Sequence, residues 1–399
     1  MPRLLHIAMF VDQHPRTLGG MQTSVRLQRK FLEAEGHRVT IVSPRRRSDE
    51  APDASLIPLP SLPLGVGEYA LTLPGRISDR SLERQLRGRP PVDVVHVQAD
   101  FWQAVTGYRF ARRHGLPVVH TMHNRLDVGL EATVPLPSLV QRLFGALQKL
   151  FLRTPGPAAR DAWQYLRAFT VNAQAVTAPS SHFARLLQER GVFGAVDVVP
   201  NGLDDSVAAE LLATPKPPRT GRNRLVWIGR FSPEKRLLPF LEAVRRSGID
   251  AEIHIFGDGS ERRRAEAAAR GISPAKVVFH GTVPYREMLA HLRASDLLVQ
   301  TSQGFETQGM TVFEAAALGT PAVLSDHRIA EDLAGSTYWL TPDDTVDGLA
   351  AAIRAAVGDL PSDGARPADA LDPSTLLQSR HTRSMAHVYE RAIGARRNA

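Results

Sequence analysis

The sequence predicts an α/β protein of two doubly wound domains, each with a parallel sheet and a core of its own. Short β-branched segments alternate with helical patterns along the 399 residues, which is typical of parallel βαβ units. These segments form two successive series, and a polar stretch rich in proline lies between them at 213–223. Two series indicate two sheets rather than one very wide sheet.

The domain boundaries follow from these two series. Proline supplies no ladder donor and stiffens the chain, so the stretch between the series indicates a linker. We expect the first domain over 1–203 and the second over 204–375. A helix at 376–396, after an irregular stretch at 360–373, is expected to pack back on the first domain. Strands are expected at 4–11, 38–43, 92–97, 117–122, 175–178 and 196–199 in the first series, and at 224–228, 251–256, 276–280, 297–301 and 322–325 in the second.

The composition excludes several classes of site. The chain has no cysteine, so it has no disulfide, no thiolate nucleophile and no cysteine-based zinc site. The apolar segment at 4–11 lacks the features of a signal peptide, and no uncharged apolar run approaches the roughly 18–20 residues of a membrane span. We expect a cytoplasmic protein that meets a membrane only from the side.

The charge is unevenly distributed. Lys and Arg exceed Asp and Glu by 9 over residues 1–200, whereas the remainder has a net charge of −1. A basic first half indicates an anionic partner such as a nucleic acid, a phosphorylated acceptor or an acidic lipid surface. The alternative explanation is that the arginine-rich composition reflects the base content of the source genome. No basic segment with interleaved aromatic residues is present, so we do not expect nucleic-acid binding.

One segment, at 138–153, combines apolar residues at helical spacing with cations. The pattern fits an amphipathic helix at an anionic membrane surface. A helix that packs on the sheet and carries ordinary surface charges is the alternative. The apolar residues are Leu139, Leu143, Leu147, Leu150 and Phe151, and the cations are Arg142, Lys149 and Arg153.

The most informative segment follows the fourth strand of the second series. It passes through a glycine-containing turn and opens a helix near Gly309, where backbone N–H groups and the helix dipole favour an anion. A pyrophosphate fits over Gly309, Met310 and Thr311. Glu306 and Glu314 each carry a carboxylate that can accept two hydroxyl hydrogen bonds, which suits sugar binding. The alternative, a glycosidase acid/base pair, would need no adjacent phosphate site, so the glycine turn beside the two glutamates argues against it.

A second cluster, Arg230 and Lys235, follows the first strand of the same series. The carboxyl ends of strands are where open α/β sheets bind ligands. Arginine can bind a phosphate through two hydrogen bonds, and lysine adds a compact charge. Such a pair alone is usually solvated surface, but beside Glu306 and Glu314 it indicates a phosphate site.

Two features of the first domain also lie at the carboxyl ends of predicted strands. Gly19 and Gly20 follow the first strand and allow close approach of a ligand to the backbone, although a plain flexible turn is the alternative. His123 follows the strand at 117–122, where a histidine is more often structural than catalytic. His120 should point into or behind the sheet.

Together these residues resemble glycosyltransferase family 4, which includes phosphatidylinositol mannosyltransferases, diacylglycerol glucosyltransferases and sucrose synthases. The resemblance covers nearly the whole chain and implies the GT-B fold, in which two Rossmann-like domains enclose a cleft. The motifs that carry it are Gly19-Gly20, Gly36-His37-Arg38-Val39, Val95-His96-Val97, His123, Pro200-Asn201-Gly202, Gly229-Arg230 with Lys235, and the paired glutamates Glu306 and Glu314.

The resemblance implies a role for each residue of the second domain. Arg230 and Lys235 would hold the donor diphosphate and serve catalysis. Glu306, also counted as catalytic, would bind the sugar hydroxyls, and Glu314 the ribose hydroxyls. The backbone at Gly309, Met310 and Thr311 would bind the distal phosphate.

In the first domain, the resemblance implies that Gly20 approaches the donor and that the catalytic His123 lies beside the C6 hydroxyl and the anomeric centre. Gly19, Asn124 and Asp127 are candidates for the acceptor side. Family members use no metal-binding Asp-x-Asp motif, so we expect neither a metal nor a cofactor, and Asp204-Asp205 should lie at the surface.

Two departures from the family pattern concern the donor site. Gln308 stands where the family commonly has phenylalanine, and the stretch 325–331 lacks the glycines usual before the next helix.

We therefore expect a retaining transferase that moves a hexose from a GDP-mannose or UDP-glucose type of donor to a hydroxyl of a lipid or phosphorylated polyol. It would act at the cytoplasmic face of an anionic membrane. Transfer to a soluble acceptor is one alternative. A sugar-nucleotide 2-epimerase and a non-catalytic lipid- or nucleotide-binding module are the others.

Overall fold

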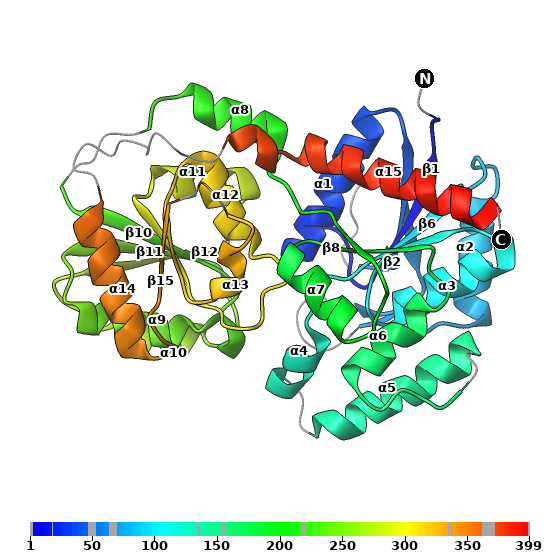
Figure 1. Cartoon of the computed structure of the whole chain (residues 1–399), viewed down its shortest axis with the longest axis horizontal. Helices are drawn as coiled ribbons and strands as arrows, with labels where there is room; N and C mark the ends of the chain where they lie inside the picture. Colours follow the sequence, from blue (N-terminus) through cyan, green and yellow to red (C-terminus); the bar gives the residue numbers. More distant parts are fainter. Residues whose placement is uncertain are drawn as a thin grey trace. The chain divides into compact units, whose positions relative to one another are not determined.

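The computed structural model describes residues 3–17, 19–46, 53–63, 70–133, 136–153, 156–216, 221–333, 335, 337–360 and 372–397. The chain forms two compact units (Figure 1). Unit 1 comprises Met1–Asn201 and His381–Ala399, and unit 2 comprises Gly202–Arg380. Each unit contains one large parallel sheet, so the predicted α/β class with two sheets is confirmed. The cleft expected between the domains stays a prediction.

The sheet of unit 1 has seven strands in the order β3-β2-β1-β6-β7-β8-β9. The chain builds outward from β1 to β3 and then returns to place β6 on the other side of β1, so the strand order reverses between β1 and β6. Ligands of open α/β sheets bind outside the carboxyl ends of the strands at such a point. The strands are β1 His6–Val11, β2 Arg38–Pro44, β3 Leu56–Leu59, β6 Val94–Gln98, β7 Val118–Thr121, β8 Ala175–Ala178 and β9 Val196–Val198, and a separate hairpin pairs β4 Leu62–Pro63 with β5 Ala70–Leu71.

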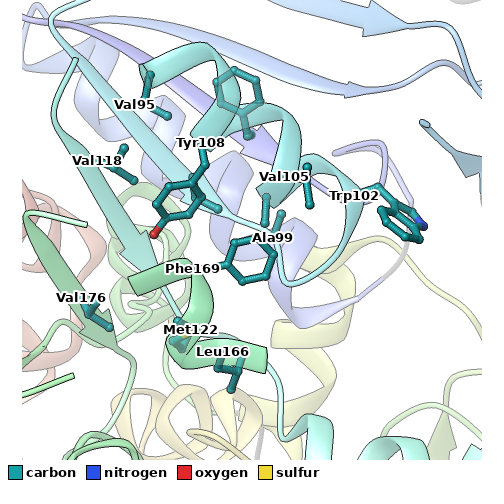
Figure 2. Packing of buried hydrophobic residues seen from close by; sticks show 14 of the residues in the cluster. Val95, Ala99, Trp102, Val105, Tyr108, Val118, Met122, Leu166, Phe169 and Val176 are labelled. Carbon is teal, nitrogen blue, oxygen red and sulfur yellow. The ribbon is translucent and has the colours of Figure 1, made fainter. Parts of the chain in front are cut away.

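Helices cover both faces of this sheet (Figure 1). On one face, Tyr108 stacks on Phe169 with a centroid distance of 5.5 Å, and Val95, Val118 and Val176 complete the packing (Figure 2). The helices are α1 Gly20–Ala34, α2 Arg76–Leu86, α3 Trp102–His114, α4 Leu126–Thr133, α5 Pro137–Leu152, α6 Ala162–Thr170, α7 Ser181–Glu189 and α15 Gln378–Arg397.

The C-terminal helix packs on unit 1, as expected. Met385, Val388 and Tyr389 of α15 are buried in one cluster with Val25 and Leu32 of α1. The expected helix at 376–396 starts two residues later, at Gln378, because a short 3-10 turn (η2, Pro373–Leu376) precedes it. Of the expected irregular stretch at 360–373, residues 361–371 lie outside the described part of the chain.

The sheet of unit 2 has six strands in the order β12-β11-β10-β13-β14-β15, and the order reverses between β10 and β13. The strands are β10 Asn223–Ile228, β11 Ala251–Phe256, β12 Lys276–Gly281, β13 Leu297–Gln300, β14 Ala322–Leu324 and β15 Tyr338–Leu340. The helices are α8 Asp205–Ala213, η1 Pro233–Lys235, α9 Leu237–Ser247, α10 Arg262–Ala269, α11 Tyr285–Ala294, α12 Met310–Leu318, α13 His327–Ala330 and α14 Val346–Asp359.

One surface expectation is wrong. Asp204 is 6% exposed because its carboxylate caps α8, where it accepts a hydrogen bond from the backbone N–H of Ser206. Asp205 accepts one from the backbone N–H of Ser379 at 3.0 Å. Both aspartates therefore fix backbone in unit 2.

Candidate functional site

The loop that carries Arg230 is held by unusually close backbone packing. It leaves the carboxyl end of β10 and crosses the end of β11, where Gly257 has a φ of 124°. A Cβ atom on Gly257 would lie 1.9 Å from the carbonyl oxygen of Gly229, and one on Gly259 would lie 2.5 Å from that of Phe231. Only glycine permits this approach. The backbone of Arg230 is therefore fixed, while its side chain is exposed.

Lys235, at the end of the same loop, forms an ion pair with Glu306. The Nζ and Oε1 atoms are 2.6 Å apart, and the two side chains are 23% and 16% exposed. Burial opposes ionisation of Glu306, but the charge and hydrogen bond of Lys235 outweigh it and hold the pKa of Glu306 below its ordinary value. The Lys235 ammonium also lies 5.2 Å from the centroid of the Phe305 ring. Two predicted site residues thus meet directly.

The start of α12 offers backbone donors beside this pair. Gly309 is the N-cap residue and has a φ of 82°, a left-handed conformation that favours glycine. No side chain caps the helix, and its first turn contains no acidic residue. The N–H groups of the turn that begins at Met310 and Thr311 can therefore bind an anion.

Glu314 lies one turn further along α12 and is 5% exposed. Burial raises its pKa to about 7, although a hydrogen bond of 2.7 Å from the Tyr285 hydroxyl opposes the shift. Tyr285, at the start of α11, was missed from the sequence because a single tyrosine after a proline gives no signal of a site.

The segment 325–331, which departs from the family pattern, holds the loop that carries Glu306 in place. Asp326, 4% exposed, accepts a hydrogen bond of 2.9 Å from the backbone N–H of Gly304 and binds the Arg328 guanidinium through both oxygens. This fixes the loop that carries Glu306 to the start of α13. Gln308 is 2% exposed and fills the position expected for an aromatic residue.

In unit 1, His123 lies just beyond the carboxyl end of β7 and is 8% exposed. Its Nε2 atom is 3.0 Å from Oε1 of Gln98, and burial lowers its pKa to about 4, so the ring is neutral at pH 7. As expected, His120 points into the protein, where its Nδ1 lies 3.1 Å from the Tyr108 hydroxyl and its Nε2 lies 3.0 Å from the carbonyl oxygen of Ala99.

Two aspartates that sequence reasoning missed lie where the strand order reverses. Asp12, just after β1, accepts hydrogen bonds from the backbone N–H groups of Asp100, Phe101 and Gln103 and so joins β1 to the start of α3. Asp100 is 1% exposed, and one of its oxygens accepts a hydrogen bond from the Asn124 side chain. Burial and the nearby charge of Asp12 raise the pKa of Asp100 to about 7. Burial alone raises the pKa of Asp12 to about 6.

The remaining acceptor-side candidates are two glycines at the edge of the sheet and an aspartate that is already paired. Gly19 is the N-cap of α1 with a φ of 155°, and Gly20 is the first residue of that helix, so both lie at the carboxyl edge of the sheet. Asp127 accepts hydrogen bonds from Nε and Nη2 of Arg125 at 2.9 and 2.8 Å, so its carboxylate is already neutralised.

Two family models match the chain. Residues 18–207 match the model described as Glycosyltransferase Family 4, and residues 222–359 match the model described as Glycosyl transferases group 1. The chain is a glycosyltransferase whose first half matches family 4. The first match covers most of unit 1 and the second covers most of unit 2, so the enzyme is a glycosyltransferase along almost its whole length.

Relatives of this glycosyltransferase include two enzymes named for lipids. Alpha-monoglucosyldiacylglycerol synthase of Streptococcus pneumoniae is 24% identical over 84% of this chain and 75% of its own. The GDP-mannose-dependent alpha-(1-6)-phosphatidylinositol dimannoside mannosyltransferase of Mycobacterium tuberculosis is 28% identical over 89% of this chain and 87% of its own. The crystal structure of Anabaena HepE in complex with UDP-glucose has the same fold, with a TM-score of 0.67 at 16% identity over 97% of this chain and 99% of that chain.

Proposed function

We propose that this glycosyltransferase moves a hexose from a nucleotide-diphosphate sugar, of the GDP-mannose or UDP-glucose type, to a hydroxyl group of a membrane lipid with retention of anomeric configuration. The observation that carries the lipid acceptor is a row of exposed leucines flanked by cations on α5. The donor side rests on the Lys235–Glu306 pair beside the uncapped start of α12.

The donor would lie at the carboxyl edge of the unit 2 sheet. Lys235, Arg230 and the first-turn N–H groups of α12 would face the diphosphate, whereas Glu306 would accept hydrogen bonds from the sugar. Binding of the diphosphate would draw the Lys235 ammonium away from a full pairing with Glu306 and free a carboxylate oxygen for a sugar hydroxyl. Glu314, buried one turn further on, would bind the ribose hydroxyls.

In the reaction, the bond from C1 of the hexose to the phosphate oxygen breaks, and a bond from C1 to the acceptor oxygen forms on the same face. The acceptor hydroxyl gives its proton to the departing phosphate oxygen, so no protein nucleophile is needed. Negative charge grows on the diphosphate as the bond breaks. Preorganised cations and N–H groups at that position are worth about 10²–10³ in rate each where they have been tested.

The acceptor head group would lie at the carboxyl edge of the unit 1 sheet. Asn124, which is exposed and whose side chain is held by the buried Asp100 carboxyl, would hydrogen-bond a polyol hydroxyl there. His123 lies on the neighbouring strand end and is neutral, so it can accept or donate a hydrogen bond without placing a charge beside the sugar.

Helix α5 presents an apolar surface outside these polar groups. Its inner face is packed, with Gly145, Gln148 and Leu152 buried. On its outer face, Leu139, Leu143 and Leu150 are 61%, 55% and 67% exposed, and Leu136 just before the helix is 70% exposed. Arg142, Lys149 and Arg153 flank these leucines. Leu147 and Phe151, the other apolar residues predicted for this face, pack against the core instead. Exposed leucines on one helix with cations beside them fit the surface of an anionic bilayer.

A second basic surface lies on α2, which packs on the same α3 helix as α5. Asp79 and Glu83 on the inner side of α2 pair with Arg109, Arg113 and His114 of α3. The outer side carries exposed arginines one turn apart, and no ion pair is found for them among the described residues. They are Arg76, Arg80, Arg84 and Arg87.

The relatives' names support a lipid acceptor, since one concerns diacylglycerol and another phosphatidylinositol dimannoside. Within the described part of the chain, no helix has the length and apolarity of a membrane span. The proposal is therefore a peripheral contact, made through α5 and α2.

The test combines vesicle binding with sugar transfer. Wild-type protein should co-sediment with phosphatidylglycerol vesicles and transfer hexose from GDP-mannose or UDP-glucose to diacylglycerol or phosphatidylinositol embedded in them. Leu139→Ser with Leu143→Ser should abolish co-sedimentation, whereas Leu212→Ser, at an exposed leucine of unit 2, should not. Transfer only to a water-soluble polyol, with no vesicle binding, would overturn the lipid acceptor, and conversion of the donor without acceptor would identify an epimerase.

A further inference from the structure

The Glu314 carboxylate of unit 2 is held from a neighbouring helix. Tyr285 is the first residue of α11, and its hydroxyl donates a hydrogen bond of 2.7 Å to Oε1 of Glu314 on α12. The two helices pack together through Leu289 and Leu292 of α11 and Val312 of α12, which belong to one buried cluster (Figure 1). The place of the Tyr285 hydroxyl is therefore set by helix packing and not by a loop.

A second hydrogen bond attaches α11 to the same segment of the chain. The Thr320 hydroxyl, just after α12, donates to the backbone carbonyl oxygen of Leu292 at 3.0 Å, and Thr320 is buried. Helix α11 is thus bound to the α12 segment near both of its ends. Tyr285 therefore keeps its place opposite Glu314.

The two oxygens of Glu314 have different surroundings. Among the described residues, the Tyr285 hydroxyl is the only donor to this carboxylate, and it binds Oε1. Oε2 accepts no hydrogen bond from them and is not one of the fully buried oxygens that lack a partner, so a ligand can reach it. An unpaired oxygen in a nearly buried carboxylate favours a ligand that brings a hydroxyl donor, because leaving it unpaired costs free energy.

We propose that Tyr285 is a positioning residue of the donor site, whose hydroxyl holds Glu314 through Oε1 and leaves Oε2 as the oxygen that binds a ribose hydroxyl. This rests on the proposed function for the role of Glu314. The same hydroxyl supports the ionised carboxylate, because a hydrogen-bond donor stabilises its negative charge. It thereby opposes the burial that raises the pKa of Glu314 to about 7.

The first measurement uses thermal melts of the full-length protein without nucleotide. Tyr285→Phe should raise the pKa of Glu314 further, since the hydrogen bond that favours the ionised form is lost. The stability that this bond supplies is present when Glu314 is ionised and absent when it is protonated in both proteins. Relative to the wild type, the melting temperature of Tyr285→Phe should therefore fall more at about pH 8.5 than at about pH 5.5. In a Glu314→Gln background, Tyr285→Phe should change it equally at both pH values.

The second measurement is calorimetric binding of UDP and of GDP as a function of pH. Affinity for the nucleotide that binds should rise with pH as Glu314 ionises, near pH 7 in the wild type. In Tyr285→Phe the rise should come at a pH about one unit higher, as expected when a hydrogen bond to a charged group is lost. At pH 7 the affinity of this variant should be about fivefold lower, because the ionised fraction of Glu314 would fall from about a half to about a tenth.

Tyr338→Phe is the matched control. Tyr338, on β15, packs against the same buried cluster as Tyr285, and its hydroxyl has no hydrogen bond to any described residue. This variant should alter neither the pH at which affinity rises nor the pH dependence of melting. A Tyr285→Phe protein whose affinity rises at the wild-type pH, and whose melting difference is the same at both pH values, would overturn the proposal. A wild type that binds neither UDP nor GDP, with melts that behave as expected, would instead count against the proposed function.

Discussion

Replacing Lys235 by alanine is the sharpest test of the donor site. The substitution removes the ammonium that lies 2.6 Å from Glu306. It keeps the backbone carbonyl group of Lys235, which accepts the hydrogen bond from the Thr301 hydroxyl. Glu306 would lose the charge that keeps its pKa low, so burial would then raise that pKa. We expect folding to persist and turnover to fall.

The size of the effect follows from the surroundings of the ammonium. A hydrogen bond to a charged group is worth about 1.5–3 kcal/mol, which corresponds to about 10-fold to 150-fold in rate. The Lys235 and Glu306 side chains are 23% and 16% exposed, so water screens them in part. We therefore expect kcat to fall about 10-fold to 100-fold.

The assay is transfer from a radiolabelled nucleotide sugar, with a thermal melt to confirm folding. Lys276→Ala, at an exposed lysine of β12 in the same unit, is the matched control and should retain full activity. A kcat for Lys235→Ala within about twofold of the wild type, in a protein that melts normally, would show that the Lys235 ammonium does not serve the reaction.

Three further outcomes are expected. Because the pKa of Glu314 is about 7, its carboxylate gains a proton as pH falls from 8 to 6, and calorimetric affinity for the nucleotide sugar should fall over that range but not in Glu314→Gln. Burial lowers the pKa of His254, which lies 2.8 Å from His280, to about 4. The unfolded chain then binds more protons than the folded chain between about pH 6.5 and 4, so the free energy of unfolding by urea should decrease as pH falls through that window. Finally, a Cβ at Gly145 would lie 2.1 Å from the Ala159 carbonyl oxygen, so Gly145→Ala should destabilise the protein by about 1–3 kcal/mol in thermal melts, whereas Gly394→Ala, which meets nothing within 4 Å, should not. A flat pH profile in either titration, or an unchanged melt for Gly145→Ala, would contradict the corresponding contact.

The fold was predictable because its long buried strands carry strong signals. Segments such as 251–256, which alternates Ile253 and Ile255 with other residues, lie between clear helical patterns, and the structure has β11 at those residues. The short edge strands β3 and β15 were missed. Pro58 lies within β3, and β15 has three residues, so neither contains enough of a pattern to predict a strand.

The candidate site was predictable where the residues share one loop or one helix. Two pairs of residues follow strands closely in the sequence and could be predicted from that order: Arg230 with Lys235, and Glu306 with Glu314. In the structure, Lys235 forms an ion pair with Glu306. Their functional roles stay predictions.

The residues missed from the sequence depend on contacts between distant segments. Asp12 and Asp100 become neighbours only because the sheet places β1 beside β6. Tyr389 reaches His96 only because α15 packs on unit 1. Spacing along the chain cannot reveal such contacts.

The proposed function requires a nucleotide diphosphate to bind at the start of α12 in unit 2. A crystal structure of the enzyme with UDP or GDP would test it most directly. We expect oxygens of the distal phosphate to accept hydrogen bonds from the backbone N–H groups of Met310 and Thr311, with Lys235 Nζ turned from Glu306 toward the phosphate. A diphosphate bound elsewhere, with the Lys235–Glu306 pair intact, would contradict it.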